Sequence, residues 1–202
     1  MPASAVQIAN LALTKLGEHR ILSLTDDSKQ ARCINALFDL WRDAELARHR
    51  WKFALTRQQL AADAASPDWG YDFAYTLPSE LLSLVQVGEF YVPSGSKAKG
   101  PWQREGAKLL TDISAPLKIR FVQRVTNTGL FHPLFVVAFA CRLAHEACEE
   151  ITQSSAKKQA LAAEYRDTVI EAVRADAMEA TPDELPWGSW IDSREGASAD
   201  FD

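Results

Sequence analysis

The chain has 202 residues, of which 47% are apolar and 24% are charged, and its formal net charge is −5. This length and composition are typical of one packed core, or of one core with a small appended subdomain, and they exclude a disordered chain. The negative charge argues against a protein that simply coats nucleic acid, because such binding requires clustered Lys and Arg.

Two helices are predicted in the first 60 residues. The first begins after the N-cap Ser4 and ends at Gly17, because apolar residues recur with helical spacing between them and glycine favours the left-handed conformation that ends a helix. The second is capped by Thr25 or Asp26 and extends to about residue 50. The basic and aromatic stretch 51–60 either continues this second helix or bends away from it.

Short strands are predicted in the middle third of the chain, after a loop at residues 61–69. Aromatic residues alternate along 71–77, which favours a half-buried strand or an extended segment laid on a helix. Gly88 separates two apolar runs that form a strand pair or one bent strand, and Gly106 marks a hairpin. The predicted strands cover residues 71–77, 84–87, 89–92, 102–105, 108–111 and 117–125. We expect one small antiparallel sheet inserted between helical segments.

Residues 131–180 carry the most extended helical pattern in the chain. Apolar residues recur at four-residue spacing from Phe135 to Ile151, and Pro133 suits a first helical turn, where its missing N–H does no harm. A short polar break at 153–155 then forces the following helix back along the first one. The pattern therefore predicts an antiparallel αα-hairpin.

The predicted fold class is α+β and mainly α, with a bundle of long antiparallel helices, a small inserted antiparallel β-subdomain and an extended C-terminal tail. The predicted division is N-terminal helices at 1–60, a β-rich insertion at 61–127, a helical hairpin at 128–180 and the tail at 181–202. We expect the hairpin to pack with the N-terminal helices as one domain.

The C-terminal tail has a character of its own. Residues 176–202 contain eight acidic residues and one arginine, a formal charge of −7, together with Trp187 and Trp190. Large aromatic side chains are costly to expose and are enriched among the anchors of interfaces. We therefore expect the tail to bind a partner, with folding back onto its own helices as the alternative.

The three cysteines, Cys33, Cys141 and Cys148, are typical of reduced thiols, because a helical rise of about 10 Å separates the last two and prevents a disulfide between them. Cys141, His145 and Cys148 share one helix face, as zinc ligands can. The third of these residues nevertheless lies a further helical turn away from the first two. This spacing favours small, partly buried side chains of a helix over ligands of one metal ion. We expect neither a metal nor a cofactor, and neither an export signal nor a membrane span.

Two further patterns were weighed for chemistry. Carboxylates gather on two predicted helices, as Asp39, Asp43 and Glu45 on one and as Glu146, Glu149 and Glu150 on the other. Such pairs can serve a glycosidase, but solvated charged helix faces, here with Arg42 and Arg48 interspersed, give the same spacing. The basic stretch 97–124 could contact a phosphate backbone, although a solvated sheet face explains it more simply.

A set of motifs spanning nearly the whole chain resembles one protein family. The motifs are Arg48-His49-Arg50-Trp51-Lys52-Phe53-Ala54, Pro67-x-Trp69-x-Tyr71-x-Phe73-x-Tyr75-x-Leu77-Pro78, Phe131-x-Pro133-x-Phe135 and the terminal Ser189-Trp190-Ile191-x-x-Arg194. The aromatic and proline segment 67–78 is the most specific of them. The chain is similar to the tail accessory factors of short-tailed bacteriophages, also called tail tubular protein A, head-to-tail adaptors or head completion proteins.

The resemblance implies a structural virion protein without enzymatic activity. Copies of it, typically twelve, would form a ring beneath the portal protein, extend the channel through which genomic DNA passes without specific binding, and offer an attachment platform to a downstream tail (nozzle) protein. The expected location is the head-tail junction of the virion, reached through the host cytoplasm, with no membrane partner.

The resemblance also implies two groups of interaction residues. The residues expected to bind the portal or a neighbouring subunit are Trp187, Trp190, Ile191 and Arg194. The residues expected to pack subunits together are Arg48, Trp51, Trp69, Tyr71 and Tyr75. The alternative function is a virion-associated peptidoglycan hydrolase that uses the clustered carboxylates at 146–150.

Overall fold

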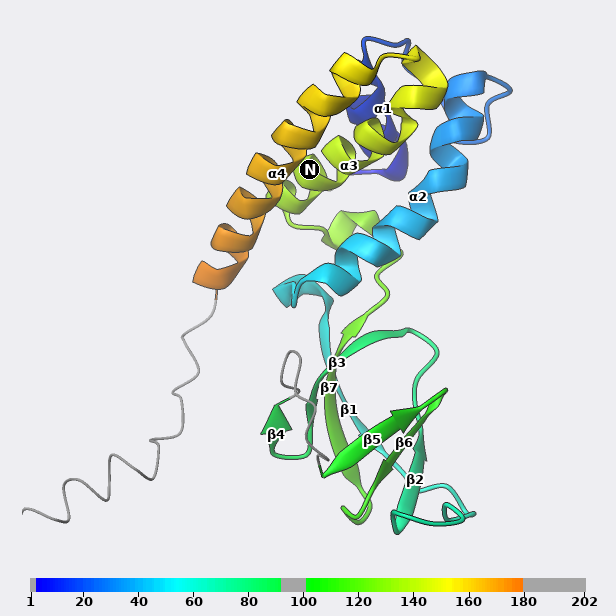
Figure 1. Ribbon diagram of the computed structural model, residues 1–202, viewed down its shortest axis with the longest axis vertical. Helices are drawn as coiled ribbons and strands as arrows, with labels where there is room; N and C mark the ends of the chain where they lie inside the picture. The colour runs from blue at the N-terminus through cyan, green and yellow to red at the C-terminus, as the bar shows by residue number, and fades with distance from the viewer. Residues whose placement is uncertain (1–2, 92–100, 180–202) are drawn as a thin grey trace, which may run out of the picture.

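The computed structural model describes residues 3–91 and 101–179 and shows a helical part next to a β part (Figure 1). The described helices are α1 (Ala5–Leu16), α2 (Lys29–Arg48), α3 (Pro133–Thr152) and α4 (Ser155–Met178), with the short 3-10 helices η1 (Lys52–Ala54) and η2 (Thr128–Leu130). The described strands are β1 (Leu55–Leu60), β2 (Phe73–Thr76), β3 (Leu81–Val87), β4 (Phe90–Tyr91), β5 (Trp102–Glu105), β6 (Lys108–Thr111) and β7 (Leu117–Gln123). The predicted α+β class, with helices and small antiparallel sheets, is confirmed.

Local capping chemistry sets the ends of the first two helices. The hydroxyl of Ser4 accepts a hydrogen bond from the backbone N–H of Gln7, whose side chain accepts one from the N–H of Ser4, and Gly17 ends α1 at φ 73°. Both ends of this helix agree with the prediction. The predicted cap of α2 is wrong, because Ser28 caps that helix and the Asp26 carboxylate instead accepts from the backbone N–H groups of residues 22 and 23.

The helical part packs around α3, which contacts α1, α2 and α4. The buried face of α3 carries Phe135 and Phe139 together with alanines that allow close helix approach. Gln153, in the left-handed conformation at φ 52°, ends α3, and Ser154 caps α4. The predicted helical hairpin and the position of its turn are therefore confirmed. Within the described ranges, no helix combines the length and apolar character needed to cross a membrane.

The β part contains two antiparallel sheets, where the sequence predicts one. The four-stranded sheet has the order β1-β7-β3-β4, and the three-stranded sheet has the order β2-β6-β5. The strand pair around Gly88 and the hairpin around Gly106 are confirmed. Two sheets form because β2 pairs with β6 rather than with its sequence neighbour β3. Both sheets contribute to a shared core that includes Tyr75, Leu109 and Phe121.

The structure shows that residues 51–60, for which the sequence allows either a continued helix or a bend, bend away from α2. Helix α2 ends at Arg48, the chain bends through η1, and β1 then pairs with β7 along its whole length. The β part thus begins at Leu55, six residues before the predicted boundary at 61. The pairing of β1 with a strand about sixty residues away explains why its polar sequence carries no clear strand pattern of its own.

An aromatic cluster joins the two parts of the molecule. Trp51, at the start of η1, packs edge-on against Phe135 of α3, and Phe53 packs against both Phe131 and Phe135. The indole N–H of Trp51 donates to the carbonyl of Glu45 at 2.8 Å. Because this cluster is buried and hydrogen-bonded, it fixes the direction in which the chain leaves α2 for the β part.

Candidate interaction surfaces

Two of the residues predicted to pack subunits together lie inside the subunit instead. Trp51 is 1% exposed and belongs to the aromatic cluster. Tyr75 is fully buried in the core of the β part, its hydroxyl donates to the carbonyl of Ile113 at 2.7 Å, and burial raises its pKa. The prediction of a packing role between subunits is therefore corrected for both, because neither side chain is available to a neighbouring copy.

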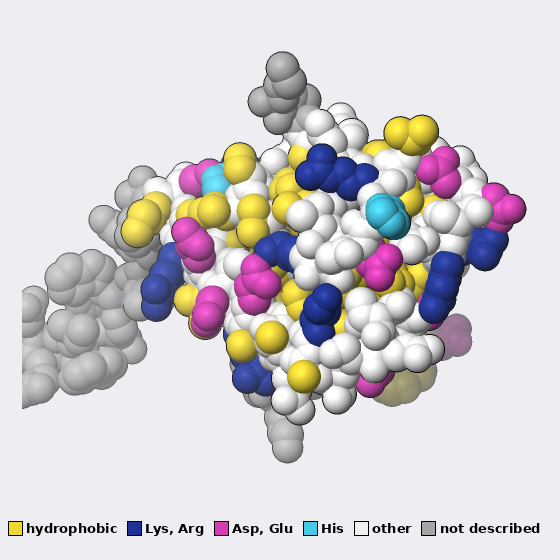
Figure 2. All heavy atoms as spheres, turned by 90° about the horizontal axis from the view of Figure 1, so that it is seen from above, with side chains coloured by type: hydrophobic (Ala, Val, Ile, Leu, Met, Phe, Trp, Pro, Cys, Tyr) yellow, Lys and Arg dark blue, Asp and Glu magenta, His cyan; other side chains and the backbone are white. Residues whose placement is uncertain are grey.

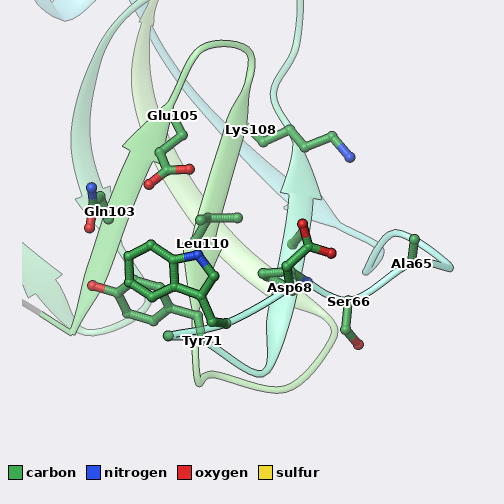
Figure 3. A pocket seen from close by; sticks show the side chains of 12 residues that line it. Ala65, Ser66, Asp68, Tyr71, Gln103, Glu105, Lys108 and Leu110 are labelled. Carbon is green, nitrogen blue, oxygen red and sulfur yellow. The ribbon is translucent and has the colours of Figure 1, made fainter.

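Trp69 and Tyr71 line a hollow at the end of the β part, which we call the aromatic-loop pocket. It has a volume of about 320 Å³ and lies between the loop 65–71 and the hairpin β5–β6. Figure 3 shows Tyr71 on the side of Gln103 and Leu110, with Asp68 and Ser66 on the loop opposite. The pocket is therefore lined by residues of two separate elements, and charged side chains such as Asp68, Glu105 and Lys108 lie around it together with Tyr71 and Leu110.

The most exposed aromatic group near the aromatic-loop pocket is Trp69, whose residue is 85% exposed. The base of the loop is fixed, because Asp63 accepts hydrogen bonds from the hydroxyl and N–H of Thr76 and pairs with Lys108 at 3.1 Å. The hydrogen bond from Lys108 is the main reason that the pKa of Asp63 is lowered. A loop that is held at its base and presents an indole to solvent is suited to anchoring a partner.

Arg48, the third predicted packing residue, belongs to a polar network between α2 and α4. Its guanidinium donates to the hydroxyl of Tyr165, which in turn donates to the carboxylate of Glu45 at 2.7 Å. Glu45 is 4% exposed, which corrects its predicted place on a solvated helix face. Burial, together with the hydrogen bond to Glu45, raises the pKa of Tyr165. Half of the Arg48 side chain remains exposed, so it can still meet a neighbouring copy.

Arg142 of α3 completes this network. Its guanidinium lies over the ring of Trp41, 3.8 Å from the ring centroid, and its Nη2 is 3.1 Å from the Glu146 carboxylate. Its Nε is 3.7 Å from the Glu45 carboxylate, beyond hydrogen-bonding distance, and is the one buried side-chain polar atom among the described residues without a hydrogen-bond partner. The network thus ties three helices together by charge and stacking.

Of the carboxylates considered for hydrolysis on α3, those of Glu146 and Glu149 are engaged in ion pairs. Glu146 is held by Arg142 and by His145, and Glu149 pairs with Lys158 at 2.7 Å. The hydrogen bond from Lys158 lowers the pKa of Glu149, which is the opposite of what a proton-donating carboxyl of a glycosidase requires. On the second helix, Asp39 and Asp43 pair with Arg42. Both groups therefore fit ion-paired helix faces better than a catalytic pair.

The three cysteines are free and buried, and in Cys33 burial raises the pKa to about 12. Cys141 and Cys148 lie in the core of the helical part, whereas His145 bonds Glu146 at 3.0 Å. No group of three metal-binding side chains forms within residues 3–91 and 101–179. Of the three residues that resemble a zinc motif, Cys141 and Cys148 therefore pack in the core, and His145 takes part in a charged contact.

The last turn of α4 is fastened to the junction between the two parts. Asp176 is 1% exposed; its carboxylate accepts from the backbone N–H of Lys52 at 2.7 Å and lies 3.1 Å from Nε2 of His49. Glu179 lies 3.5 Å from Nε2 of His132. The acidic sequence of residues 176–202 does not predict that Asp176, its first acidic residue, is buried. The predicted portal-binding residues Trp187, Trp190, Ile191 and Arg194 lie outside the described residues.

Charges at the helical end of the molecule are mixed. Figure 2 shows Lys and Arg side chains interspersed with Asp and Glu over this end. Among them, Lys15 of α1 pairs with Glu164 of α4, and Lys29 donates to the carbonyl of Glu150. A mixed, largely paired surface of this kind favours solubility and helix packing over steering of one charged ligand.

Comparison with protein-family models and with curated proteins finds no match for this chain.

Proposed function

We propose that the protein is a structural head-to-tail adaptor of a short-tailed bacteriophage. The observation that carries the proposal is the position of Trp69. The segment 67–78 bears the most specific part of the resemblance to such adaptors, and it contributes the loop and strand beside the aromatic-loop pocket. Of the large apolar side chains exposed in the described parts of the chain, that of Trp69 alone is aromatic. An exposed indole on a fixed loop is a suitable anchor for a neighbouring protein.

In this proposal, copies of the chain form a ring, of twelve subunits as the resemblance implies, beneath the portal. The long helices of each subunit would be arranged radially in the ring. The β part would contact the next subunit or the downstream tail protein. The net charge of −5 suits a conduit, because like charge keeps passing DNA from adhering to the wall. The protein would join the virion at the head-tail junction after synthesis in the host cytoplasm.

The C-terminal tail would supply a second attachment. Trp187, Trp190 and Ile191 are three of the large apolar residues in 181–202, and Arg194 is the one basic residue of this segment. In this role they would leave the subunit that bears them and bind the portal or the next copy through their large aromatic side chains. Asp176 and Glu179 fix the point from which the tail departs.

The test is the mass of particles formed with purified portal protein, measured for the wild-type chain, Trp69→Ala and Leu22→Ala. Leu22 is 94% exposed and serves as the matched apolar control outside the pocket. We expect the wild type and Leu22→Ala to add a ring to the portal, and Trp69→Ala to lose this ring while remaining folded. A chain that never joins the portal, or a Trp69→Ala variant that joins it normally, would contradict the proposal.

A further inference from the structure

One face of the four-stranded sheet carries cations that nothing in the described chain neutralises. Arg57 of β1 lies opposite Arg120 of β7, and Gln59 lies opposite Lys118. Side chains alternate along a strand, and the neighbouring residue Ile119 is buried in the core of the β part, so Lys118 and Arg120 point the other way. With Gln86 of β3 these residues line a hollow of about 540 Å³. We call this the basic face.

The cations of the basic face differ from others nearby in having no ion pair within residues 3–91 and 101–179. Arg124, just beyond the end of β7, pairs with Asp43 at 2.7 Å, and Lys108 of the other sheet pairs with Asp63. Like charges placed directly opposite each other on two strands repel, which is the arrangement of Arg57 and Arg120. An anion between them would relieve this repulsion. The basic face therefore has the charge and the side-chain types that suit an anionic partner.

The chain itself contains a segment with the complementary charge. Residues 180–202 hold six acidic residues and one arginine, a formal charge of −5. Trp187 and Trp190 lie between two acidic groups, Asp183-Glu184 on one side and Asp192 with Glu195 on the other. Arginine binds carboxylates through paired hydrogen bonds and also stacks on indole rings, so a surface of arginine, lysine and glutamine suits this alternation of acid and tryptophan.

The position of the last described residues places this segment within reach of the basic face. Asp176 bonds the backbone of Lys52, which precedes Arg57 by only five residues along the chain. An extended segment of 23 residues spans at most about 75 Å, at about 3.3 Å for each residue. Attachment at α4 also gives the segment a high effective concentration at its own subunit.

We propose that residues 180–202 dock on the basic face of their own subunit in the free protein. Carboxylates of the segment then neutralise Arg57, Lys118 and Arg120, and its tryptophans lie along the arginine side chains. The contact is mainly electrostatic, so salt weakens it. It is a resting arrangement: the same segment is released when a stronger partner binds it, and the basic face is exposed at that moment.

The test is zero-length carbodiimide cross-linking of the full-length protein, prepared as an equal mixture of ¹⁴N- and ¹⁵N-labelled chains. We expect a cross-link between the amine of Lys118 and a carboxylate of residues 180–202, and we expect it to join residues of the same isotope. At about 1 M salt, where the Debye length falls to about 3 Å, this cross-link should disappear. Arg57→Gln with Arg120→Gln should reduce it severalfold. The control pair Arg20→Gln with Arg166→Gln removes two exposed charges elsewhere that form no ion pair with the described residues, and it should leave the cross-link unchanged.

A second measurement, acetylation of Lys118, gives an independent readout. Neutralising the segment by Asp183→Asn, Glu184→Gln, Asp192→Asn and Glu195→Gln should raise the acetylation rate about fivefold, because the amine loses its screening partner. An unchanged rate overturns the proposal, as do cross-links that mix the two isotopes, which would assign the contact to a second copy. Salt-dependent protection of Lys118 by duplex DNA in the wild-type chain would also overturn it, because the face would then bind nucleic acid. None of these outcomes depends on binding to the portal.

Discussion

Two charged residues of the helical part and two of the β part lie in contrasting environments. In the helical part, Glu45 and Asp176 are buried, and each is held by hydrogen bonds from another element. In the β part, Arg57 and Arg120 face each other across two strands, with no ion pair in the described chain. A buried charge must be satisfied inside the fold, whereas an exposed one is free to meet a partner. Buried charges of the helical part therefore help to specify the fold, and we propose that the exposed cations of the β part meet a partner.

Two tryptophans provide the largest expected contrast between fold and surface. Trp51→Ala removes a ring that is 1% exposed from the aromatic cluster, and we expect a loss of about 3–5 kcal/mol in the free energy of unfolding. Trp69→Ala is the matched control of the same residue type and should cost less than about 0.5 kcal/mol, because its ring is exposed. Urea denaturation of both variants measures this. Equal losses in the free energy of unfolding would contradict the assignment of Trp51 to the core and of Trp69 to the surface.

Asp176 tests whether a buried charge holds the two parts together. Asp176→Ala leaves the N–H of Lys52 without its acceptor, and we expect a loss of about 2–3 kcal/mol in the free energy of unfolding. Asp167→Ala, on the exposed side of the same helix, is the control and should change little. A stability of Asp176→Ala indistinguishable from that of Asp167→Ala would show that this carboxylate does not fasten α4.

The hydrogen bond between Tyr165 and Glu45 predicts a pH dependence of stability. Because the pKa of Tyr165 is raised by folding, the folded state keeps a proton that the unfolded state releases above about pH 10. Stability from this group is thus complete below pH 10 and falls above it, by up to about 1.4 kcal/mol for each pH unit until the folded pKa is reached. Tyr165→Phe should flatten this alkaline loss.

A double-mutant cycle separates the Tyr165–Glu45 bond from general packing. Tyr165→Phe alone should cost about 1 kcal/mol at pH 7, and together with Glu45→Gln the two changes should be non-additive by about 0.5 kcal/mol or more. Chemical denaturation of the four proteins gives the coupling energy. Additive losses would mean that the two groups act independently.

The features that could be predicted from the sequence are those determined by neighbouring residues. Ser4 with Gln7 and Gly17 fixes both ends of α1 through contacts a few residues apart, and Gly106 specifies the hairpin in the same way. The turn between α3 and α4 follows from a local break in the apolar pattern.

The features that could not be predicted depend on residues far apart in the chain. The position of Glu45 on α2 predicts a solvated side chain. It is instead buried, and the residues that contact its carboxylate include Tyr165, 120 residues away, and Arg142. Likewise β1 becomes a strand by pairing with β7. Tyr75, in the three-stranded sheet, is buried in the core shared with the four-stranded sheet, and no local pattern in the sequence predicts that the strands form two sheets. Of the predicted interaction residues within 3–91 and 101–179, the exposed Trp69 and the partly exposed Arg48 and Tyr71 can still meet a partner, whereas Trp51 and Tyr75 are buried.

The most direct test of the β part as the recognising surface is oxidative footprinting of the full-length protein, alone and bound to portal particles. The rate of Trp69 oxidation in the free chain reflects a residue that is 85% exposed. We predict that this rate falls about tenfold in the assembled state, because a desolvated anchor excludes the oxidant, whereas Leu22 stays equally reactive. Unchanged oxidation of Trp69 in a portal-bound ring would contradict the account.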